Sequence, residues 1–383
     1  MANSTVFTKP AKPYHDFPLF PHATKRWAKK IRGKLHYFGP WSEPDAALNK
    51  YLDQRDDLHA GRVPRVSGET LTVRDLCNRF LTVKEQQRDS GDITGITFAD
   101  YLRTCAAIVN SFGKTRLVDD LAADDFESLR SSLAKQYGPH RLGNTVQRIR
   151  SVFKYSYDAG LIDKPVRFGP AFKRPSARLH RLHRQKNGAR MFAPADLRKI
   201  IETADQPLKS MILLGINCGF GNNDCGTLPL SALDLKTGWV NYPRPKTAIE
   251  RRCPLWPETV ATVKDAITKR PTPKLLEQAS LVFITKYGAA WAKKTEDNPI
   301  TKEMRKLLDE LMLYRRGMGF YALRHTFETI AGECRDQVAV NHIMGHADAS
   351  MAGAYREHIS DARLRDAVNV VRAWLFPKKK RCK

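Results

Sequence analysis

Apolar residues recur every three to four positions along much of this chain, which is the spacing of one face of an α-helix. Four such stretches lie between residues 70 and 160, and short polar loops join them. Amphipathic helices connected by short loops bury their apolar faces against one another. The pattern predicts a bundle of four helices, over residues 70–87, 97–112, 122–137 and 141–160.

A different pattern, strict alternation, precedes the bundle in residues 25–41. The alternation breaks near Arg32 and Gly33, where two strands can turn back on each other, and Ser42 then caps a helix that ends before Gly61. We expect a basic β-ribbon supported by one helix. Such a ribbon fits a DNA major groove, although a solvated face on a small accessory sheet has the same pattern. The candidate DNA contacts are Lys29, Lys30, Arg32 and Lys34.

Helical spacing returns after residue 190 and alternates there with short strand-like runs. Strands are expected around residues 238–257 and in "SLVFIT", with helices on both sides and to the end of the chain. The expected fold class is mainly α with small β-sheets (α+β): an N-terminal β-ribbon plus helix, a helical bundle and a mixed α/β domain. The expected boundaries are 1–66, 67–172, a basic linker 173–190, 191–376, and a basic tail 377–383.

Charge narrows the class of partner. The 383 residues include 65 Lys and Arg against 40 Asp and Glu, a formal charge of +25, which makes a polyanion, by default double-stranded DNA, the expected partner. The linker has seven basic residues and no acid, and lacks helical periodicity, so we expect it to follow a DNA backbone rather than form a helix. For the linker, the alternative is a flexible tether. For the last bundle helix, the alternative is an ordinary solvated face. The candidate phosphate contacts of these two segments are Arg148, Arg150, Lys154, Arg178, Arg181 and Arg184.

Other function classes receive no support from the sequence. No apolar run is long enough to cross a bilayer, and the N-terminus lacks the apolar core of a signal peptide, so we expect a cytoplasmic, nucleoid-associated protein with no membrane partner. Seven scattered cysteines show no metal-ligand spacing, which favours reduced thiols and no structural metal. No nucleotide-binding glycine loop is present, and no cofactor is expected.

The stretch "FYALRHTFETIAGECR", residues 320–335, places Arg324 on the flank of an apolar helix stripe. A guanidinium in that position needs an anion, because it cannot lose its proton and its burial without a partner is costly. Glu328, one turn later, is one possible partner, but this order of Arg and Glu is the weaker one on a helix. The alternative is a phosphate from outside the chain.

Two further elements follow Arg324 in order: a Gly-His turn with His346, and Tyr355 nine residues later. With "LRHTF", this arrangement resembles the tyrosine recombinase, or phage integrase, family. The resemblance implies site-specific DNA cleavage and rejoining through a 3′-phosphotyrosyl intermediate on Tyr355, with Arg324 and His346 on the phosphate. It implies that Lys246, in "RPKT", is the general acid. It also implies a dimer to tetramer on DNA.

The chain departs from the family pattern at two positions. Gly221 stands where the family has its first arginine, although the acidic Asp224 three residues later is retained, and Tyr321 replaces a histidine. Removing one preorganised charge from a transition state commonly costs about 2–4 kcal/mol. We hypothesise that Arg251 or Arg252 partly compensates. The alternative function is a catalytically weakened or inactive DNA-binding protein derived from an integrase; a relaxing topoisomerase is a third, which the domain order disfavours.

The chain is expected to end in an amphipathic helix over residues 360–375, with Leu364, Val368 and Val371 on its apolar face. In the family such a helix docks into a neighbouring protomer. Packing within its own domain is equally compatible with the sequence.

Overall fold

The computed structural model describes residues 9–60, 71–293, 297–348 and 350–377. The chain divides into two compact units, and the division runs through four helices. The first unit comprises residues 1–82, 105–131 and 148–172, and the second comprises 83–104, 132–147 and 173–383. The domain boundaries expected from the sequence are still a prediction, and most of the basic tail lies outside the described residues.

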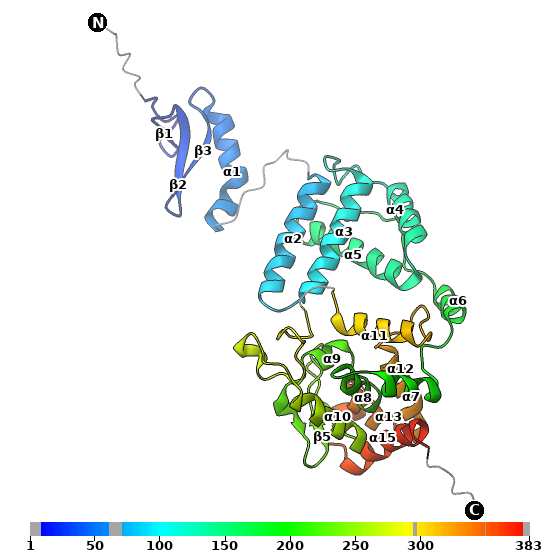
Figure 1. Cartoon of the computed structure of the whole chain (residues 1–383). Helices are drawn as coiled ribbons and strands as arrows, with labels where there is room; N and C mark the ends of the chain where they lie inside the picture. The colour runs from blue at the N-terminus through cyan, green and yellow to red at the C-terminus, as the bar shows by residue number, and fades with distance from the viewer. Residues whose placement is uncertain (1–8, 61–70, 294–296, 349, 378–383) are drawn as a thin grey trace, which may run out of the picture. The chain divides into compact units, whose positions relative to one another are not determined.

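The N-terminal part of the described chain consists of a three-stranded antiparallel sheet and one helix (Figure 1). Strands β2 (Arg26–Ile31) and β3 (Lys34–Pro40) are the expected ribbon, and α1 (Pro44–Ala60) is the expected helix. Strand β1 (Phe20–His22), which the pattern did not predict, pairs with β2. Arg32 and Gly33 both have positive φ, the conformation that a tight hairpin turn requires.

The four helices expected after this group are present. They are α2 (Val73–Asp89), α3 (Gly95–Phe112), α4 (Ala123–Gln136) and α5 (Pro139–Asp158). Inside the first unit their apolar faces meet in a cluster of aromatic rings, in which Phe126 contacts Phe112, Phe153 and Phe172 edge to face. The spacing of apolar residues therefore predicted these helices to within a few residues.

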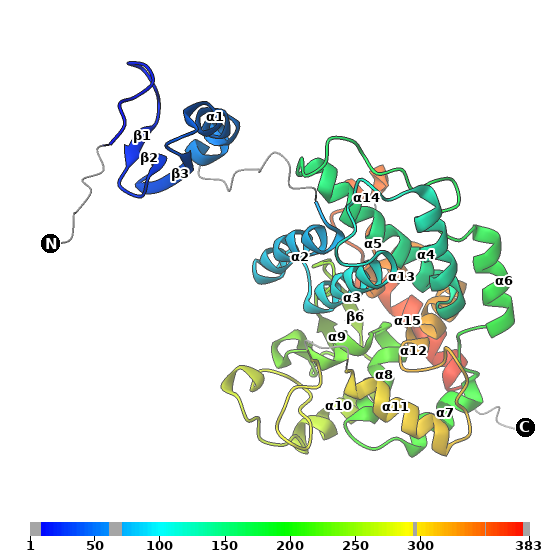
Figure 2. The same ribbon diagram turned by 90° about the horizontal axis from the view of Figure 1, so that it is seen from above.

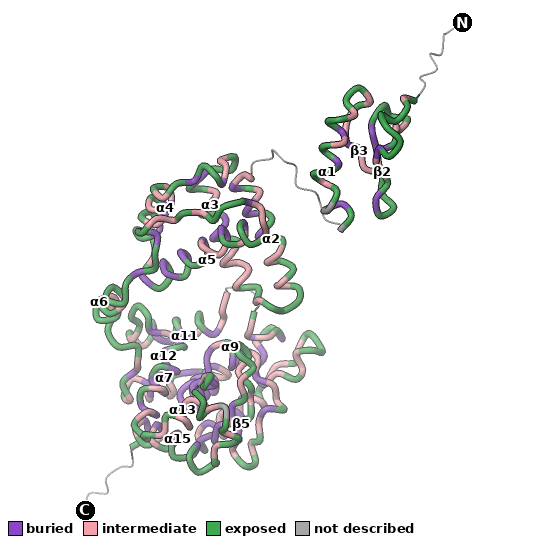
Figure 3. Tube along the Cα trace, turned by 180° about the vertical axis from the view of Figure 1, so that it is seen from behind, coloured by how far each residue is buried: buried purple, intermediate pink, exposed green. Residues whose placement is uncertain are grey.

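The basic linker contains a helix, contrary to expectation. Helix α6 spans Ala177–Asn187, with Ser176 capping its start and Gly188 at its end. None of its residues is buried, and Figure 3 shows it exposed or half-exposed along its length. The prediction failed because it required a buried face, whereas caps and strong helix formers such as Arg, Leu and Gln support this helix without one.

The remaining elements belong to the second unit (Figure 2). Its sheet has the order β4-β5-β6 and is antiparallel, with strands Leu233–Asp234, Trp239–Asn241 and Arg252–Pro254. The expected strand "SLVFIT" is reduced to isolated bridges at Leu281 and Ile284. The helices are α7 (Pro194–Thr203), α8 (Leu208–Cys218), α9 (Asn222–Gly226), α10 (Pro257–Thr268), α11 (Pro299–Glu310), α12 (Ala322–Ala331), α13 (Gln337–Met344), α14 (Met351–Ala354) and α15 (Asp361–Leu375), with single 3₁₀ turns at Leu230–Ala232, Leu276–Gln278 and Gly332–Cys334.

Helix α8 lies at the centre of this unit and packs against α10, α12 and α15. Every residue of α8 except Lys209 is buried. Helix α15 contributes Leu364, Val368 and Val371 to the same core. The apolar face of α15 is therefore buried in its own domain. No helix in the described part of the chain has the length and apolar character to span a membrane.

Candidate phosphate-binding site

Arg324 is buried at the start of α12, only 3% exposed. The apolar stripe that forms this helix, including Leu323 and Phe327, packs against α8 and brings the guanidinium to the end of that helix. Its Nη1 donates to the carbonyl of Gly219 at 2.6 Å, and its Nη2 donates to the carbonyl of Met344 at 2.7 Å. Nη2 also lies 2.9 Å from Nε2 of His346.

The charge of Arg324 has no carboxylate partner among the described residues. Glu328, the partner considered from the sequence, accepts a hydrogen bond from Gln337 instead. Carbonyl dipoles satisfy the N–H groups of Arg324 but do not neutralise its charge. A buried guanidinium held this way is suited to an anion from outside the chain.

The turn after α13 places His346 beside Arg324. Gly345 ends this helix with φ of 62°, a left-handed conformation that glycine adopts without strain. The backbone N–H of His346 then donates to the carbonyl of Asn341. Burial and, after it, the Arg324 charge lower the pKa of His346. The imidazole is therefore neutral near pH 7 when no anion is bound.

Gly221 and Asp224 lie at the N-terminus of α9. Oδ2 of Asp224 accepts the N–H of Gly221 at 2.7 Å, and Oδ1 pairs with Nη2 of Arg251 at 3.2 Å. The guanidinium of Arg251 is buried over the ring of Phe220 and also donates to the carbonyl of Tyr242. The structure thus brings together Asp224 and one of the two arginines proposed to compensate for Gly221.

The second proposed arginine, Arg252, is engaged elsewhere. It forms a two-pronged ion pair with Asp361, donates to Asn241 and stacks on Trp239. Neighbours with successive numbers in a strand point to opposite faces, and this alternation turns Arg252 away from Asp224. The geometry does not support the expectation that Arg252 compensates.

Lys246 lies in the tip of the hairpin that joins β5 to β6. The N–H groups of Thr247 and Ala248 close this turn on the carbonyl of Arg244. The Lys246 side chain is exposed and has no hydrogen bond or ion pair among the residues that the structure describes. Its position in a turn of the small sheet agrees with the expectation from the sequence, and its role as general acid is a proposal.

Tyr355 directly follows the single-turn helix α14 and is 78% exposed. Asp348 supports the segment before it: Oδ1 of this carboxylate accepts from Ser350, the N-cap of α14, and Oδ2 pairs with Arg356. These contacts lower the pKa of Asp348 to about 2. Tyr321, at the N-cap of α12, is half-exposed and contacts the His325 ring edge to face.

The candidate DNA contacts differ in accessibility. Lys30, Arg32, Lys34, Lys154, Arg178, Arg181 and Arg184 are exposed, whereas Lys29, Arg148 and Arg150 are half-buried. Lys29 lies over the Tyr51 ring, Lys154 pairs with Asp158, and Arg150 donates to the carbonyl of Phe172. For Arg150 these contacts indicate a role within the fold, because its guanidinium also stacks on Phe168.

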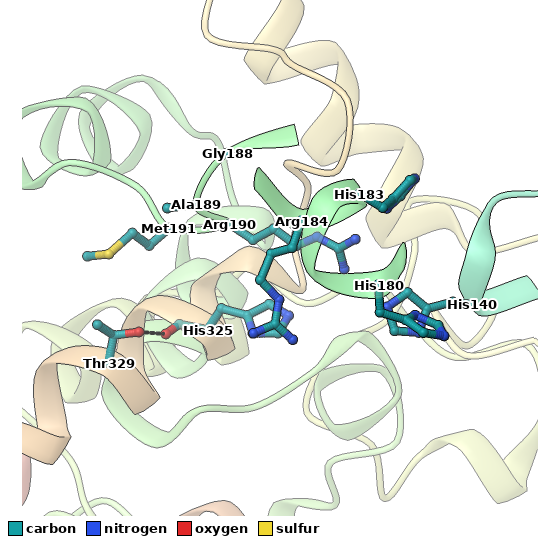
Figure 4. A pocket seen from close by; sticks show the side chains of 10 residues that line it. All are labelled: His140, His180, His183, Arg184, Gly188, Ala189, Arg190, Met191, His325 and Thr329. Carbon is teal, nitrogen blue, oxygen red and sulfur yellow. Dashed lines mark hydrogen bonds between the residues drawn. The ribbon is translucent and has the colours of Figure 1, made fainter. Parts of the chain in front are cut away.

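A cavity of about 490 Å³ lies beside α6 within the second unit. Its lining includes several imidazoles and two guanidinium groups but no carboxylate, and Figure 4 shows their side chains. Arg184 was predicted from the basic linker, but the histidines were not, since single histidines far apart in sequence give no common signal. The lining residues are His140, His180, His183, Arg184, Gly188, Ala189, Arg190, Met191, His325 and Thr329.

Among the described residues, no group of three or more His, Cys, Asp or Glu side chains is arranged to hold a metal ion. The six cysteines in the described ranges are free thiols. Arg324 itself carries only N–H donors, so its guanidinium can bind an anion but cannot be a metal ligand. The site combines a buried guanidinium and an imidazole, a pair suited to an anion, with an exposed phenol nine residues after His346.

Comparison with known proteins identifies the class. Residues 190–361 match the model of the Phage integrase family. Matching solved structures include a transposon Tn1549 integrase with a circular intermediate DNA (15% identity, TM-score 0.57, 78% of this chain and 99% of that one) and a lambda integrase dimer bound to a COC′ core site (14%, 0.54, 89% and 94%). A lambda integrase tetramer bound to a Holliday junction also matches (13%, 0.55, 91% and 98%). No curated protein matches the sequence significantly.

Residues 190–361 are those of a phage integrase, or tyrosine recombinase, domain, and the matching solved structures share the fold of the chain. This confirms the resemblance and the fold class inferred from the sequence: a mainly helical protein with small sheets and an integrase catalytic domain.

Proposed function

We propose that this chain is a site-specific DNA recombinase that cleaves and rejoins double-stranded DNA through a 3′-phosphotyrosyl intermediate. One observation chiefly supports the proposal: Arg324 is buried beside His346, no carboxylate among the described residues pairs with it, and the exposed Tyr355 follows in the same unit. A DNA phosphate supplies the missing negative charge.

In the proposed reaction, the phenol oxygen of Tyr355 forms a bond to phosphorus while the bond to the 5′ oxygen breaks. The phenol loses a proton and the 5′ oxygen gains one, so the number of protons does not change. Lys246 is the proposed donor to the leaving oxygen. Arg324 and His346 stabilise the negative charge that develops on the nonbridging oxygens. The phosphodiester becomes another phosphodiester, so neither a cofactor nor an external energy source is required.

The proposed partner is duplex DNA, bound by more than one copy of the chain. The lambda integrase structures described above contain a dimer and a tetramer on DNA, and we propose a comparable assembly here. The exposed lysines of the ribbon and the arginines of α6 are the proposed backbone contacts. The proposal implies that the protein acts in the cytoplasm, on the DNA of the nucleoid.

The test uses the full-length chain and DNA duplexes that it selects from a randomised pool. Each selected duplex is nicked at successive positions, so that a cleaved strand loses its short 5′-hydroxyl fragment and the covalent complex accumulates. We expect an adduct that resists denaturation with wild type but not with Tyr355→Phe. Tyr287→Phe is the matched control, because Tyr287 is also highly exposed.

A second candidate function is supported by Gly221, which offers no side chain at the position of the family's first arginine. In this alternative the chain occupies DNA sites without cleaving them. Tight binding of the selected duplexes with no adduct at any nick position supports that alternative and contradicts the first proposal.

A further inference from the structure

Arg244, which the sequence did not single out, reaches the turn that holds His346. It lies on the β5–β6 hairpin, two residues before Lys246, and its backbone N–H donates to the carbonyl of Ile249. Its half-buried side chain donates through Nη1 to the carbonyl of Gly345 at 3.3 Å. This distance is long for an N–H···O bond, so the bond is weak and readily exchanged.

Arg244 and Arg324 therefore donate to the carbonyls of consecutive residues, Gly345 and Met344. Two guanidinium groups are brought to one turn although like charges repel. Burial and then the neighbouring Arg244 lower the pKa of Arg324, which reflects this repulsion. Neither group has a carboxylate partner among the described residues. An anion bound between them relieves the repulsion and strengthens every hydrogen bond that it accepts.

The other arginines near the hairpin do not have this freedom. Arg251 is buried and shares its charge with Asp224, and Arg252 is paired with Asp361. Arg244 is the guanidinium on the hairpin that is partly exposed, unneutralised by the described carboxylates and adjacent to Arg324.

We propose that Arg244 is a further catalytic residue: the second guanidinium of the phosphate site, which contacts a nonbridging oxygen of the DNA backbone together with Arg324. The inference rests on the proposed function. It means that the charge missing at Gly221 is supplied from the hairpin that also holds Lys246.

The test compares wild type, Arg244→Ala, Arg244→Lys and the control Arg365→Ala in the full-length chain. Arg365 is an exposed arginine that stacks on Trp239, so its loss changes the net charge equally. On a nicked duplex with an ordinary scissile phosphate, we expect Arg244→Ala to slow adduct formation about 100-fold. Arg244→Lys should retain part of the rate and Arg365→Ala nearly all of it.

A second substrate separates a direct contact from a structural role. It carries a methylphosphonate at the scissile position, so one nonbridging oxygen and its negative charge are absent. If Arg244 neutralises that charge, the deficit of Arg244→Ala shrinks to less than about tenfold on this substrate. An equal deficit on both substrates, or no deficit on either, overturns the inference.

Failure of the proposed function gives a different result. If wild type forms no adduct on either substrate, the recombinase proposal fails, and anion binding decides the role of Arg244. Inorganic phosphate, compared with chloride at equal ionic strength, should raise the melting temperature of wild type and Arg365→Ala but not of Arg244→Ala. An equal rise in all three variants shows that Arg244 is not part of an anion site.

Discussion

The Nη2 group of Arg324 lies 2.9 Å from Nε2 of His346. Guanidinium is only a donor, so Nε2 must accept, and the imidazole proton must be on Nδ1. The imidazole therefore cannot donate from Nε2 to a phosphate in this arrangement. For Nε2 to donate, it must take up a proton and release the hydrogen bond from Arg324, and a bound phosphate favours the protonated ring because it adds negative charge.

This relationship predicts how stability depends on pH. The folded-state pKa of His346 is lowered below its unfolded value near 6.5, so the unfolded chain binds more protons at mildly acidic pH. The contribution of His346 to the free energy of unfolding should therefore fall as the pH drops from about 6.5 through the folded-state pKa. His325 and His342 have lowered pKa values too and act in the same direction.

Urea unfolding of full-length wild type and His346→Asn at pH 7.5 and pH 5.5 measures this effect. The loss of stability between the two pH values should be smaller in the variant. Equal losses in both proteins mean that His346 is not held neutral by the fold.

Gly345→Ala should destabilise the chain and slow DNA cleavage. A methyl group at this position meets Arg251 Cδ at 2.7 Å, and φ is 62°. Left-handed strain and overpacking together should cost about 2–4 kcal/mol. Gly332→Ala is the control, because φ there is −58° and an added methyl group meets its nearest neighbour, Oε1 of Gln337, only at 4.0 Å. Thermal unfolding of both variants checks the prediction, and similar melting temperatures contradict it.

A charge on the apolar face of α15 should unfold the protein rather than only weaken its assembly. Val371 is fully buried in the core of its own domain, so Val371→Asp should cost about 4 kcal/mol or more. Asn369→Asp adds the same charge on the exposed side of α15 and should change stability by less than about 0.5 kcal/mol. Circular dichroism and sedimentation at several concentrations distinguish the outcomes. A folded Val371→Asp monomer is the contrary result, since it indicates docking of this face in a partner.

The lysines of the ribbon should contribute unequally to DNA binding. Lys30 and Lys34 are exposed, whereas the ammonium of Lys29 lies 4.7 Å from the centre of the Tyr51 ring. If Lys30 and Lys34 each contact a phosphate, the double alanine variant should reduce the slope of log affinity against log salt by about 1.8. Lys29→Ala should change it less. Filter binding of the full chain from 50 to 200 mM salt provides the slopes. An unchanged slope in the double variant shows that these two lysines do not contact DNA phosphates.

An arginine restored at Gly221 should partly rescue Arg244→Ala. The backbone there has φ of −92°, and the nearest atoms to an added Cβ are Oδ2 of Asp224 and the Tyr321 ring, each at 3.4 Å. Both distances allow a side chain. We expect Gly221→Arg to raise adduct formation by Arg244→Ala at least about tenfold. No gain, with normal stability, shows that a guanidinium at position 221 does not reach the phosphate.

Local patterns predicted the helices, the ribbon and the Arg324 and His346 segment, because capping residues, turns and apolar spacing act over a few residues. They could not predict which arginine lies near Arg324. Arg244, Arg251 and Arg252 occupy one hairpin, and only the strand register and the carboxylates packed against it separate their environments. The sequence could not show that Arg252 pairs with Asp361, because the two residues are 109 positions apart.

The short sheet shows the same limit. "SLVFIT" is apolar enough for a strand, yet Leu281 and Ile284 form only isolated bridges with Pro229 and Ala290. Burial of an apolar segment does not require a continuous ladder of backbone hydrogen bonds. The unexpected helix α6 is the opposite case, in which local caps and propensities were sufficient without burial.

Helix α6 also determines the end-to-end length of the segment before Phe192. As a helix its 11 residues span about 16 Å, whereas the same residues fully extended span about 36 Å. Because none of them is buried, uncoiling loses little more than local backbone hydrogen bonds and the ring contact of His180 with His140, and the spacer can lengthen by about 20 Å. For a chain that functions as proposed, a spacer of variable length allows the segments on its two sides to separate around a duplex.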